Sequence, residues 1–294
     1  MGSCPTCSNG TCGTGVSVVR GKQNKTFMLF AGSPFGFWGG KYNETALQIF
    51  MSTLSEIRDI VDVVSVPSYF LEDPAKIQPG NAGLVPAPGG DIVTAAMQKE
   101  GFRVVPLIGD FYGQNDIERY RYYMTEGRDA FIAACVEEVR RLKLDGLNFD
   151  FEPSAASCKA HACSSSDALI FADFLTAAEG NLSALGAHAS VDTGQSILAK
   201  TQYLNESAVS QLVTMNTYYD MEGYEIALPR DVRNDGIDRF VLGVCPGCYN
   251  SSTADVRKRM DMAIEYGVRH IAYWAGADIP GVWLNGLRRW KSAA

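Results

Sequence analysis

Eight short apolar runs, rich in β-branched and aromatic residues, alternate with helix-like segments along this 294-residue chain. Repeated β-α units whose strands are apolar throughout predict a parallel sheet covered by helices. The runs predict strands over 27–33, 61–67, 102–109, 144–152, 187–193, 212–218, 239–244 and 269–274. Between them, helical spacing of apolar residues predicts helices over 44–59, 127–143, 165–185 and 251–267.

Eight such units at a mean spacing of about 35 residues favour an α/β fold of the (β/α)8 TIM-barrel type. The alternative is a doubly wound open sheet. No strand is followed by a glycine-rich phosphate loop, although many open sheets also lack one. We expect residues 1–25 to form a cysteine-containing N-terminal extension and residues 26–294 to form one barrel domain. The Pro/Gly-rich segment 77–91 is expected to be a long loop between the second strand and its helix.

The charge and the hydropathy pattern exclude some classes of partner. A net charge of −7 with no run of basic residues argues against nucleic acid and anionic lipid as partners. No stretch approaches the roughly 18–20 apolar residues of a membrane span, and the first ten residues lack an apolar signal-peptide core. A neutral polymer or a small uncharged or cationic ligand is the expected partner. With three histidines in the chain, no multi-histidine metal site is expected.

Two features predict a secreted or lysosomal glycoprotein whose leader is already removed. Eight cysteines are many for a cytosolic enzyme, and seven lie in predicted loops. We expect Cys158 and Cys163 to close a small loop, Cys135 to be buried in a helix, and the CPTC and CPGC runs to hold disulfides rather than zinc or a redox site. Six of twelve asparagines start the glycosylation triplet Asn-X-Ser/Thr: Asn9, Asn24, Asn43, Asn181, Asn205 and Asn250.

Four polar residues lie in the predicted strand over 144–152. Side chains alternate along a strand, so Asn148, Asp150 and Glu152 share one face. In a barrel they point inward and climb toward the C-terminal rim, where such enzymes place their active sites. Two close carboxyls do not both ionise cheaply, so one keeps its proton to higher pH, as a general acid requires. This predicts Glu152 as the acid and Asp150 as its partner; the alternative is a polar cluster that only fills the barrel.

The run DGLNFDFEP, residues 145–153, resembles the D-G-x-D-x-D-x-E signature of glycoside hydrolase family 18, the chitinases. It looks most like the lysosomal di-N-acetylchitobiase branch, in which Asn also occupies the position of Asn148. The segments RVVPLIGD, TMNTYYDMEG, RFVLGVCPGCY and GVRHIAYWAGAD are similar to strands 3, 6, 7 and 8 of that family, in the right order.

The resemblance implies a TIM barrel and a retaining hydrolase of β-linked N-acetylglucosamine glycans that uses no cofactor. In that family the acetamido group of the substrate replaces a protein nucleophile. Carried over to this chain, Glu152 protonates the glycosidic oxygen, Asp150 orients the acetamido group and Asn148 holds Asp150. Asp145 falls on the outward face and is expected to have a structural role.

A tyrosine of the sixth strand, Tyr218 or Tyr219, is expected to donate a hydrogen bond to the acetamido oxygen. Trp274 is expected to form the floor of the subsite. The further candidates for substrate binding are Asp220, Asp110, Phe35 and Asp192. Aromatic residues that follow the predicted strands also fit a sugar ligand, because their rings stack on pyranose faces: Phe35, Phe37, Trp38, Tyr69, Phe70, Phe111, Tyr112, Tyr218, Tyr219, Tyr249 and Trp274.

The chain departs from the family at three places. The usual Ser-x-Gly-Gly of strand 3 is replaced by LIGD, a cysteine loop follows Glu152, and the connection between the last two strands, 245–268, is too short for the α+β insertion of many chitinases. These departures leave three substrates open: chitin, chito-oligosaccharides and N-glycan cores. The competing hypotheses are a lectin or inhibitor on the same barrel, and a glycosidase for other sugars with Asp192 or Asp220 as its second carboxylate.

Overall fold

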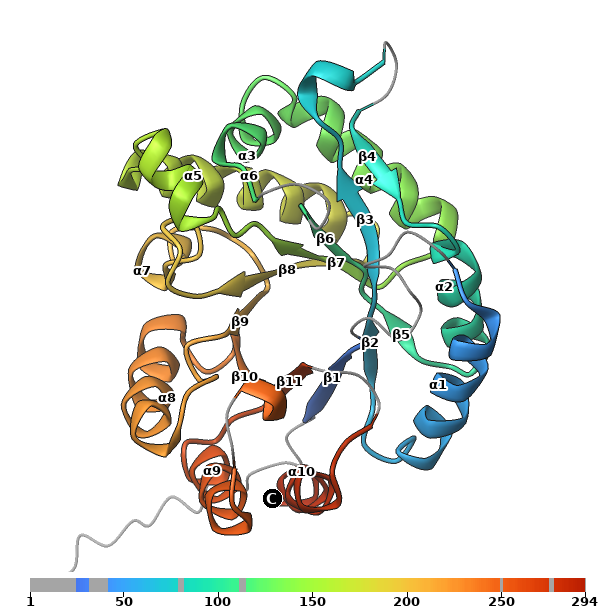
Figure 1. Ribbon diagram of the computed structural model, residues 1–294, viewed down its shortest axis with the longest axis vertical. Helices are drawn as coiled ribbons and strands as arrows, with labels where there is room; N and C mark the ends of the chain where they lie inside the picture. The colour runs from blue at the N-terminus through green and yellow to red at the C-terminus, as the bar shows by residue number, and fades with distance from the viewer. Residues whose placement is uncertain are drawn as a thin grey trace, which may run out of the picture.

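The computed structural model describes residues 25–31, 42–78, 82–110, 115–248, 251–274 and 278–293. The strands of this part form one curled sheet with helices on its outside (Figure 1). They are β1 (Thr26–Phe30), β2 (Val63–Ser65), β3 (Pro67–Leu71), β4 (Leu84–Pro86), β5 (Arg103–Val104), β6 (Leu107–Gly109), β7 (Gly146–Asp150), β8 (His188–Thr193), β9 (Gln211–Thr214), β10 (Phe240–Val244) and β11 (His270–Trp274).

The order of the strands in the sheet is β4-β3-β6-β7-β8-β9-β10-β11-β1-β2-β5. All neighbours pair in parallel except β3 and β4, which are antiparallel. β5 and β6 are consecutive pieces of one predicted strand, whereas β3 continues β2 beyond residue 67, where the predicted strand ends. Each of the eight predicted strands is therefore present, and the arrangement is that of a TIM-barrel-like fold.

Helices follow most of the strands and lie against the outer face of the sheet (Figure 1). The α-helices are α1 (Glu44–Glu56), α2 (Gly90–Lys99), α3 (Ile117–Met124), α4 (Arg128–Leu142), α5 (Ala155–Ala160), α6 (Ser165–Ser183), α7 (Thr201–Leu204), α8 (Met221–Asp235), α9 (Thr253–Glu265) and α10 (Gly281–Ser292). Short 3-10 turns cover Pro74–Lys76 (η3) and Pro246–Cys248 (η4).

Alternation along the strands divides the apolar residues into two clusters. Along β1, Phe27 and Leu29 face the helices and belong to the large outer cluster, whereas Met28 and Phe30 face the inside of the curled sheet. The inner cluster takes members from most of the strands: Met28, Phe30, Val63, Val105, Leu107, Val213, Val241 and Ala272. Two members of the inner cluster, Leu107 and Val213, lie opposite Asn148 and Asp192 in the strand register, so apolar side chains surround the polar residues of β7 and β8.

The prediction for 77–91 is wrong in part. Leu84–Pro86 forms β4, which pairs with the free edge of β3, and Gly90 already opens α2. A three-residue strand with a proline at an edge gives almost no periodic signal, so the turn residues around it dominate the pattern. The helices α8 and α10 were also not predicted from spacing. Pro229 inside α8 suggests a helix end in the sequence, yet the helix continues through it.

The cysteine predictions are confirmed where the structure describes them. Cys158 pairs with Cys163, Cys245 pairs with Cys248, and Cys135 is free and buried in α4. Cys4, Cys7 and Cys12 lie outside the described residues, as does the rest of the predicted extension before Lys25.

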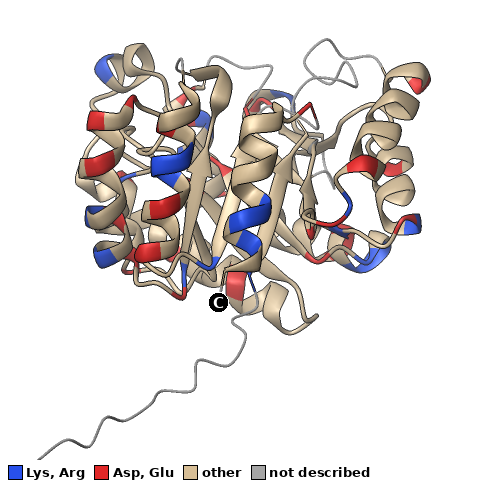
Figure 2. Cartoon of the chain, turned by 90° about the horizontal axis from the view of Figure 1, so that it is seen from below, with Lys and Arg blue, Asp and Glu red and all other residues tan. Residues whose placement is uncertain are grey.

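Acidic and basic positions are spread over the outer helices, and neither sign gathers in one large patch (Figure 2). No helix within the described ranges combines the length and the apolar character that crossing a bilayer requires. Of the six triplet asparagines, Asn43 and Asn181 are exposed, whereas Asn205 is half-buried and donates from Nδ2 to the carbonyl of Asn234 at 2.6 Å.

Candidate active site

The outward side chains of β7 fix the orientation of the strand. Phe149 and Phe151 are buried, and Phe151 stacks on Phe171 of α6 at 5.2 Å and on Tyr120 of α3 at 4.8 Å between ring centroids. Anchoring this aromatic face against two helices leaves the alternate residues, Asn148 and Asp150, on the inner face. The alternation predicted from the sequence is therefore confirmed, and Glu152 follows at the C-terminal end of the strand.

Three carboxyl groups gather at this end of the sheet: Asp150 and Glu152 from the β7 segment and Asp192 from β8. Asp192 is 5 % exposed, and the Oδ1 atom of Asp150 is buried without a hydrogen-bond partner in the described part of the chain. Burial, followed by the charges of Asp192 and Glu152, raises the pKa of Asp150 well above its usual range. Burial also raises the pKa of Glu152. The cluster therefore retains protons at pH values where exposed carboxyls have lost them.

Asp192 holds its proton through the same physical cause. Burial raises its pKa to about 8, the hydrogen bond from Asn148 acts in the opposite direction, and the charge of Glu152 raises it further. The three groups titrate as one system, because each carboxylate that ionises makes the next ionisation costlier. No Lys or Arg contributes to any of these shifts.

The expected hydrogen bond from Asn148 to Asp150 is not formed. Its Nδ2 atom donates to Ser190 Oγ at 3.0 Å and to Asp192 Oδ1 at 3.2 Å. The register explains this difference, because Asn148 lies directly opposite Ser190 on the neighbouring strand, and Asp192 is the next inward residue. Residues on adjacent strands approach more closely than residues two apart on one strand, so the amide reaches across to β8.

Glu152 lies against the turn that follows β8. A Cβ atom built on Gly194 would lie 3.6 Å from Glu152 Oε1 and 3.1 Å from the Cε atom of Met215. Because Gly194 has no side chain, space remains beside the Glu152 carboxyl. The side chain of Met215, which follows β9, lies on the other side of that space. Neither residue was singled out from the sequence, since a lone glycine and a lone methionine carry no distinctive signal.

The two candidate tyrosines occupy different environments. Tyr218 is half-buried, and a Cβ atom built on the inward Gly243 of β10 would lie 2.8 Å from its ring. Tyr219 is 43 % exposed, and its hydroxyl bonds with the side-chain amide of Gln195. Tyr218 therefore leans over the inside of the sheet, whereas Tyr219 lies at the outer margin of the site.

A buried arginine holds the loop that carries both tyrosines. Arg259 of α9 is 1 % exposed, donates from Nη1 to the carbonyl of Thr217 at 3.3 Å and bonds through Nη2 with the carbonyl of Tyr219. Its guanidinium also lies 4.4 Å from the ring centroid of Tyr224. No sequence pattern connects a helix residue some forty positions away with this loop.

Of the remaining predicted residues, Trp274 lies at the inner face of the sheet, and the aspartates have structural partners. Trp274 ends β11 beside Phe30, 5.3 Å away between ring centroids, and packs on the inner cluster.

Three of the predicted aspartates have structural partners. Asp110 is 2 % exposed and is paired with Arg119, and Asp220 caps α8 by accepting from Gly223 N at 2.9 Å. The expected structural role of Asp145 is confirmed, because it accepts from Val104 N at 2.9 Å. Phe35, Phe37, Trp38, Phe111, Tyr112 and Tyr249 lie outside the described residues.

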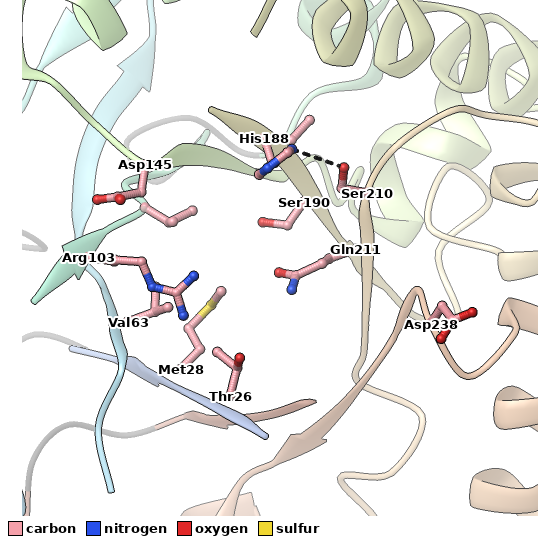
Figure 3. A pocket seen from close by; sticks show the side chains of 12 residues that line it. Thr26, Met28, Val63, Arg103, Asp145, His188, Ser190, Ser210, Gln211 and Asp238 are labelled. Carbon is pink, nitrogen blue, oxygen red and sulfur yellow. Dashed lines mark hydrogen bonds between the residues drawn. The ribbon is translucent and has the colours of Figure 1, made fainter. Parts of the chain in front are cut away.

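A separate cavity of about 230 Å³ opens at the amino ends of the strands (Figure 3). Arg103, Gln211 and Ser190 point toward it, and the His188 ring bonds with Ser210 beside it. In TIM-barrel enzymes, residues at the amino ends of the strands usually stabilise the fold, and active sites lie at the opposite rim. The described residues contain no group of three His, Cys, Asp or Glu side chains placed to hold a metal ion.

Comparison with solved structures shows that this chain shares its fold with chitinases. No protein-family model and no curated protein matches the sequence. Among solved structures, a chitinase from Chromobacterium violaceum superposes with a TM-score of 0.69 at 10% identity, over 92% of this chain and 100% of that one. The spore cortex-lytic enzyme SleL of Bacillus megaterium superposes with a TM-score of 0.69 at 11% identity, over 92% of this chain and 74% of that one.

A family 18 chitinase, ChiB of Flavobacterium johnsoniae, superposes with a TM-score of 0.63 at 13% identity, over 92% of this chain and 95% of that one. The chain has the fold of these chitinases. At such identities a likeness extends to the fold and leaves the chemistry to be argued from the site.

Proposed function

We propose that this chain is a retaining glycoside hydrolase that cleaves β-linked N-acetylglucosamine glycans by substrate-assisted catalysis. The observation that carries the proposal is the cluster of Asp150, Glu152 and Asp192 at the C-terminal end of β7 and β8, in a sheet with the chitinase fold. The raised pKa of Glu152 suits a group that must reach the reaction protonated. The run DGLNFDFEP supplies the same residue types in the order of the family signature.

In the proposed reaction, Glu152 transfers its proton to the glycosidic oxygen as the bond from that oxygen to the anomeric carbon breaks. The acetamido oxygen of the substrate bonds to the anomeric carbon in the same step, which forms an oxazolinium ring. Water then attacks the anomeric carbon, opens the ring and returns a proton to Glu152. Two inversions at one carbon retain the β configuration.

The other residues have supporting roles in this scheme. Asp150 orients the acetamido group and stabilises the oxazolinium charge, and Tyr218 donates its hydroxyl to the acetamido oxygen. Trp274 provides the floor under the sugar ring. Asn148 acts through Asp192 and Ser190, to which it is hydrogen-bonded, rather than through a direct bond to Asp150.

The environments of Asp192 and Asp220 argue against a protein nucleophile. Asp192 is 5 % exposed and engaged by Asn148, and Asp220 is engaged as the cap of α8. A nucleophile must approach the anomeric carbon directly. This favours the acetamido group of the substrate over either carboxylate.

We further propose a closed (β/α)8 barrel of one domain without the α+β insertion, in which β1 joins β11 to β2. The asparagine at position 148 supports the chitobiase branch of the family. Exposed Asn43 and Asn181 and the two disulfides support a secreted or lysosomal glycoprotein.

The test compares wild type with Glu152→Gln on chito-oligosaccharides and on an N-glycan that bears the N-acetylglucosamine core, with products identified by mass. We expect hydrolysis with retention by wild type and a loss of at least a thousandfold in Glu152→Gln. Glu265→Gln, an exposed change at the end of α9, is the control and should match wild type.

Each other outcome identifies a competing hypothesis. Unchanged turnover by Glu152→Gln would reject Glu152 as the acid. Binding without turnover in wild type would identify a lectin. A thiazoline analogue of the oxazolinium ring should inhibit, and hydrolysis that it does not inhibit would indicate a protein nucleophile.

A further inference from the structure

A cavity of about 450 Å³ lies between the turn after β8, the short helix α7 and helix α8. Gly194 forms part of its wall, and the same residue adjoins the carboxyl of Glu152, 3.6 Å from the position a Cβ atom would take. Gln195, next in the chain, also lines the cavity and bonds with the hydroxyl of Tyr219 at the margin of the site. The cavity is therefore a neighbour of the proposed acid.

The lining of this cavity is polar. It offers amide and hydroxyl groups and contains no aromatic ring, so it differs from the stacking surfaces that bind pyranose faces. Among its residues are Gln195, Lys200, Thr201, Asn216, Arg230 and Asp231. Amide and hydroxyl groups of this kind form hydrogen bonds with a polar substituent rather than with a flat ring.

The charges in the lining do not cancel. The Asp231 carboxylate is buried and accepts bonds from Arg230 Nε at 2.7 Å, Thr214 Oγ1 at 2.8 Å and Asn216 Nδ2 at 3.3 Å. Arg230 is thereby neutralised. Lys200 is exposed and forms no ion pair with any acidic side chain in the described ranges. One positive charge without an acidic partner in the described ranges thus lies in the lining of this cavity, in a chain whose net charge is −7.

We propose that this cavity is an accessory subsite that binds a carboxylate carried by the sugar chain being cleaved, with Lys200 as its counter-ion. The inference rests on the proposed function and narrows its substrate class to glycans with an anionic sugar next to the bond that Glu152 protonates. The neighbouring amides of Gln195 and Asn216 donate hydrogen bonds to the same substituent. A neutral glycan leaves the positive charge unused.

The test compares two tetrasaccharides of equal length. One is the neutral β-1,4-linked N-acetylglucosamine tetramer; in the other, alternate sugars are N-acetylmuramic acid, which carries a lactyl carboxylate. We expect wild type to have the higher kcat/KM on the anionic tetramer. Lys200→Gln should lower kcat/KM on that substrate about tenfold, mainly through KM, since it removes the counter-ion of the bound carboxylate. On the neutral tetramer, the kcat/KM of Lys200→Gln should stay within twofold of that of wild type.

Two controls separate charge from folding. Lys258→Gln removes an exposed lysine of α9 and should change neither substrate. Raising the salt concentration should weaken the preference of wild type for the anionic tetramer, because screening acts on the ion pair, and should not affect Lys200→Gln.

The failures of the two proposals are distinguishable. Hydrolysis of both tetramers without a preference that depends on Lys200 rejects the subsite and leaves the glycosidase intact. If neither tetramer is cleaved, the proposed function fails for these substrates. Calorimetric titration of Glu152→Gln and of Glu152→Gln/Lys200→Gln with both tetramers then still decides the subsite, because equal affinities in the two variants reject it.

Discussion

Gly146 on β7 lies against the backbone carbonyl of His188 on β8, and a Cβ atom at position 146 would lie 2.4 Å from that oxygen. No rotamer relieves such a contact, because both atoms belong to the backbone or are fixed to it. The glycine of the DG pair at the start of the motif is therefore required for the close pairing of the two strands that bear the carboxyl cluster.

We expect Gly146→Ala to lower the free energy of unfolding by about 1–3 kcal/mol, the usual cost of overpacking. Gly180→Ala is the matched control. Gly180 lies in α6, where an added Cβ atom meets nothing within 4 Å, so alanine should raise stability by about 0.5–1 kcal/mol. Urea unfolding of the three proteins measures both effects. Equal stability of Gly146→Ala and wild type would contradict the close approach of β7 and β8.

Arg259 should determine both the stability of the protein and the position of the tyrosine loop. Arg259→Met keeps the approximate length of the side chain but leaves the carbonyls of Thr217 and Tyr219 without their donor. We expect a loss of about 3–6 kcal/mol, since each of the two bonds from the charged donor contributes about 1.5–3 kcal/mol.

Lys258→Met, one residue away on the exposed side of α9, is the control for Arg259→Met. It should change the free energy of unfolding by less than about 0.5 kcal/mol. Denaturant titration of both variants gives the comparison. A similar stability for the two would show that Arg259 contributes no more than an exposed lysine.

Much of the fold was predictable because its strands are apolar on both faces. A run such as FRVVPLIG has to be buried between other elements, which identifies it as a strand even though a break at Val105 and Pro106 divides it into β5 and β6. In contrast, β4 is three residues long and exists because β3 offers it an edge. That pairing is a tertiary event with no local signal in LVP.

The candidate site was predictable where one strand encodes it. Alternation alone placed Asn148 and Asp150 together on the inner face of β7. The prediction that Asn148 bonds to Asp150 was wrong. The register between β7 and β8 decides which side chains meet, and the sequence of neither strand determines that register. The role of Arg259 was not predicted for a related reason. Its hydrogen-bond acceptors are backbone carbonyls of a loop about forty residues earlier in the chain.

The carboxyl cluster should make the protein less stable as pH rises. Burial raises the pKa of Asp192 to about 8, so the folded state holds a proton that the unfolded chain releases near pH 4. Between these values the folded state binds more protons, and the free energy of unfolding falls with pH by at most about 1.4 kcal/mol per unit for this group. Below that window Asp192 contributes no pH dependence, since it is protonated in both states.

We expect Asp192→Asn to flatten the decline of stability between pH 4 and 8. The amide is neutral in both states, and it also removes a charge that raises the pKa of Asp150. Urea unfolding at several pH values measures the slope, and Glu265→Gln should retain the slope of wild type. Parallel curves for wild type and Asp192→Asn would exclude a proton on Asp192.

The two tyrosines should differ sharply in activity if the proposed reaction is correct. Tyr218 leans over the inward Gly243, whereas Tyr219 is 43 % exposed and bonds with Gln195. Removing one hydrogen-bond donor to a developing charge costs about 10²- to 10³-fold in kcat. We therefore expect Tyr218→Phe to lose activity on this scale and Tyr219→Phe to stay within about threefold. Steady-state kinetics on a chito-oligosaccharide decides between them, and the reverse order would assign the acetamido contact to Tyr219.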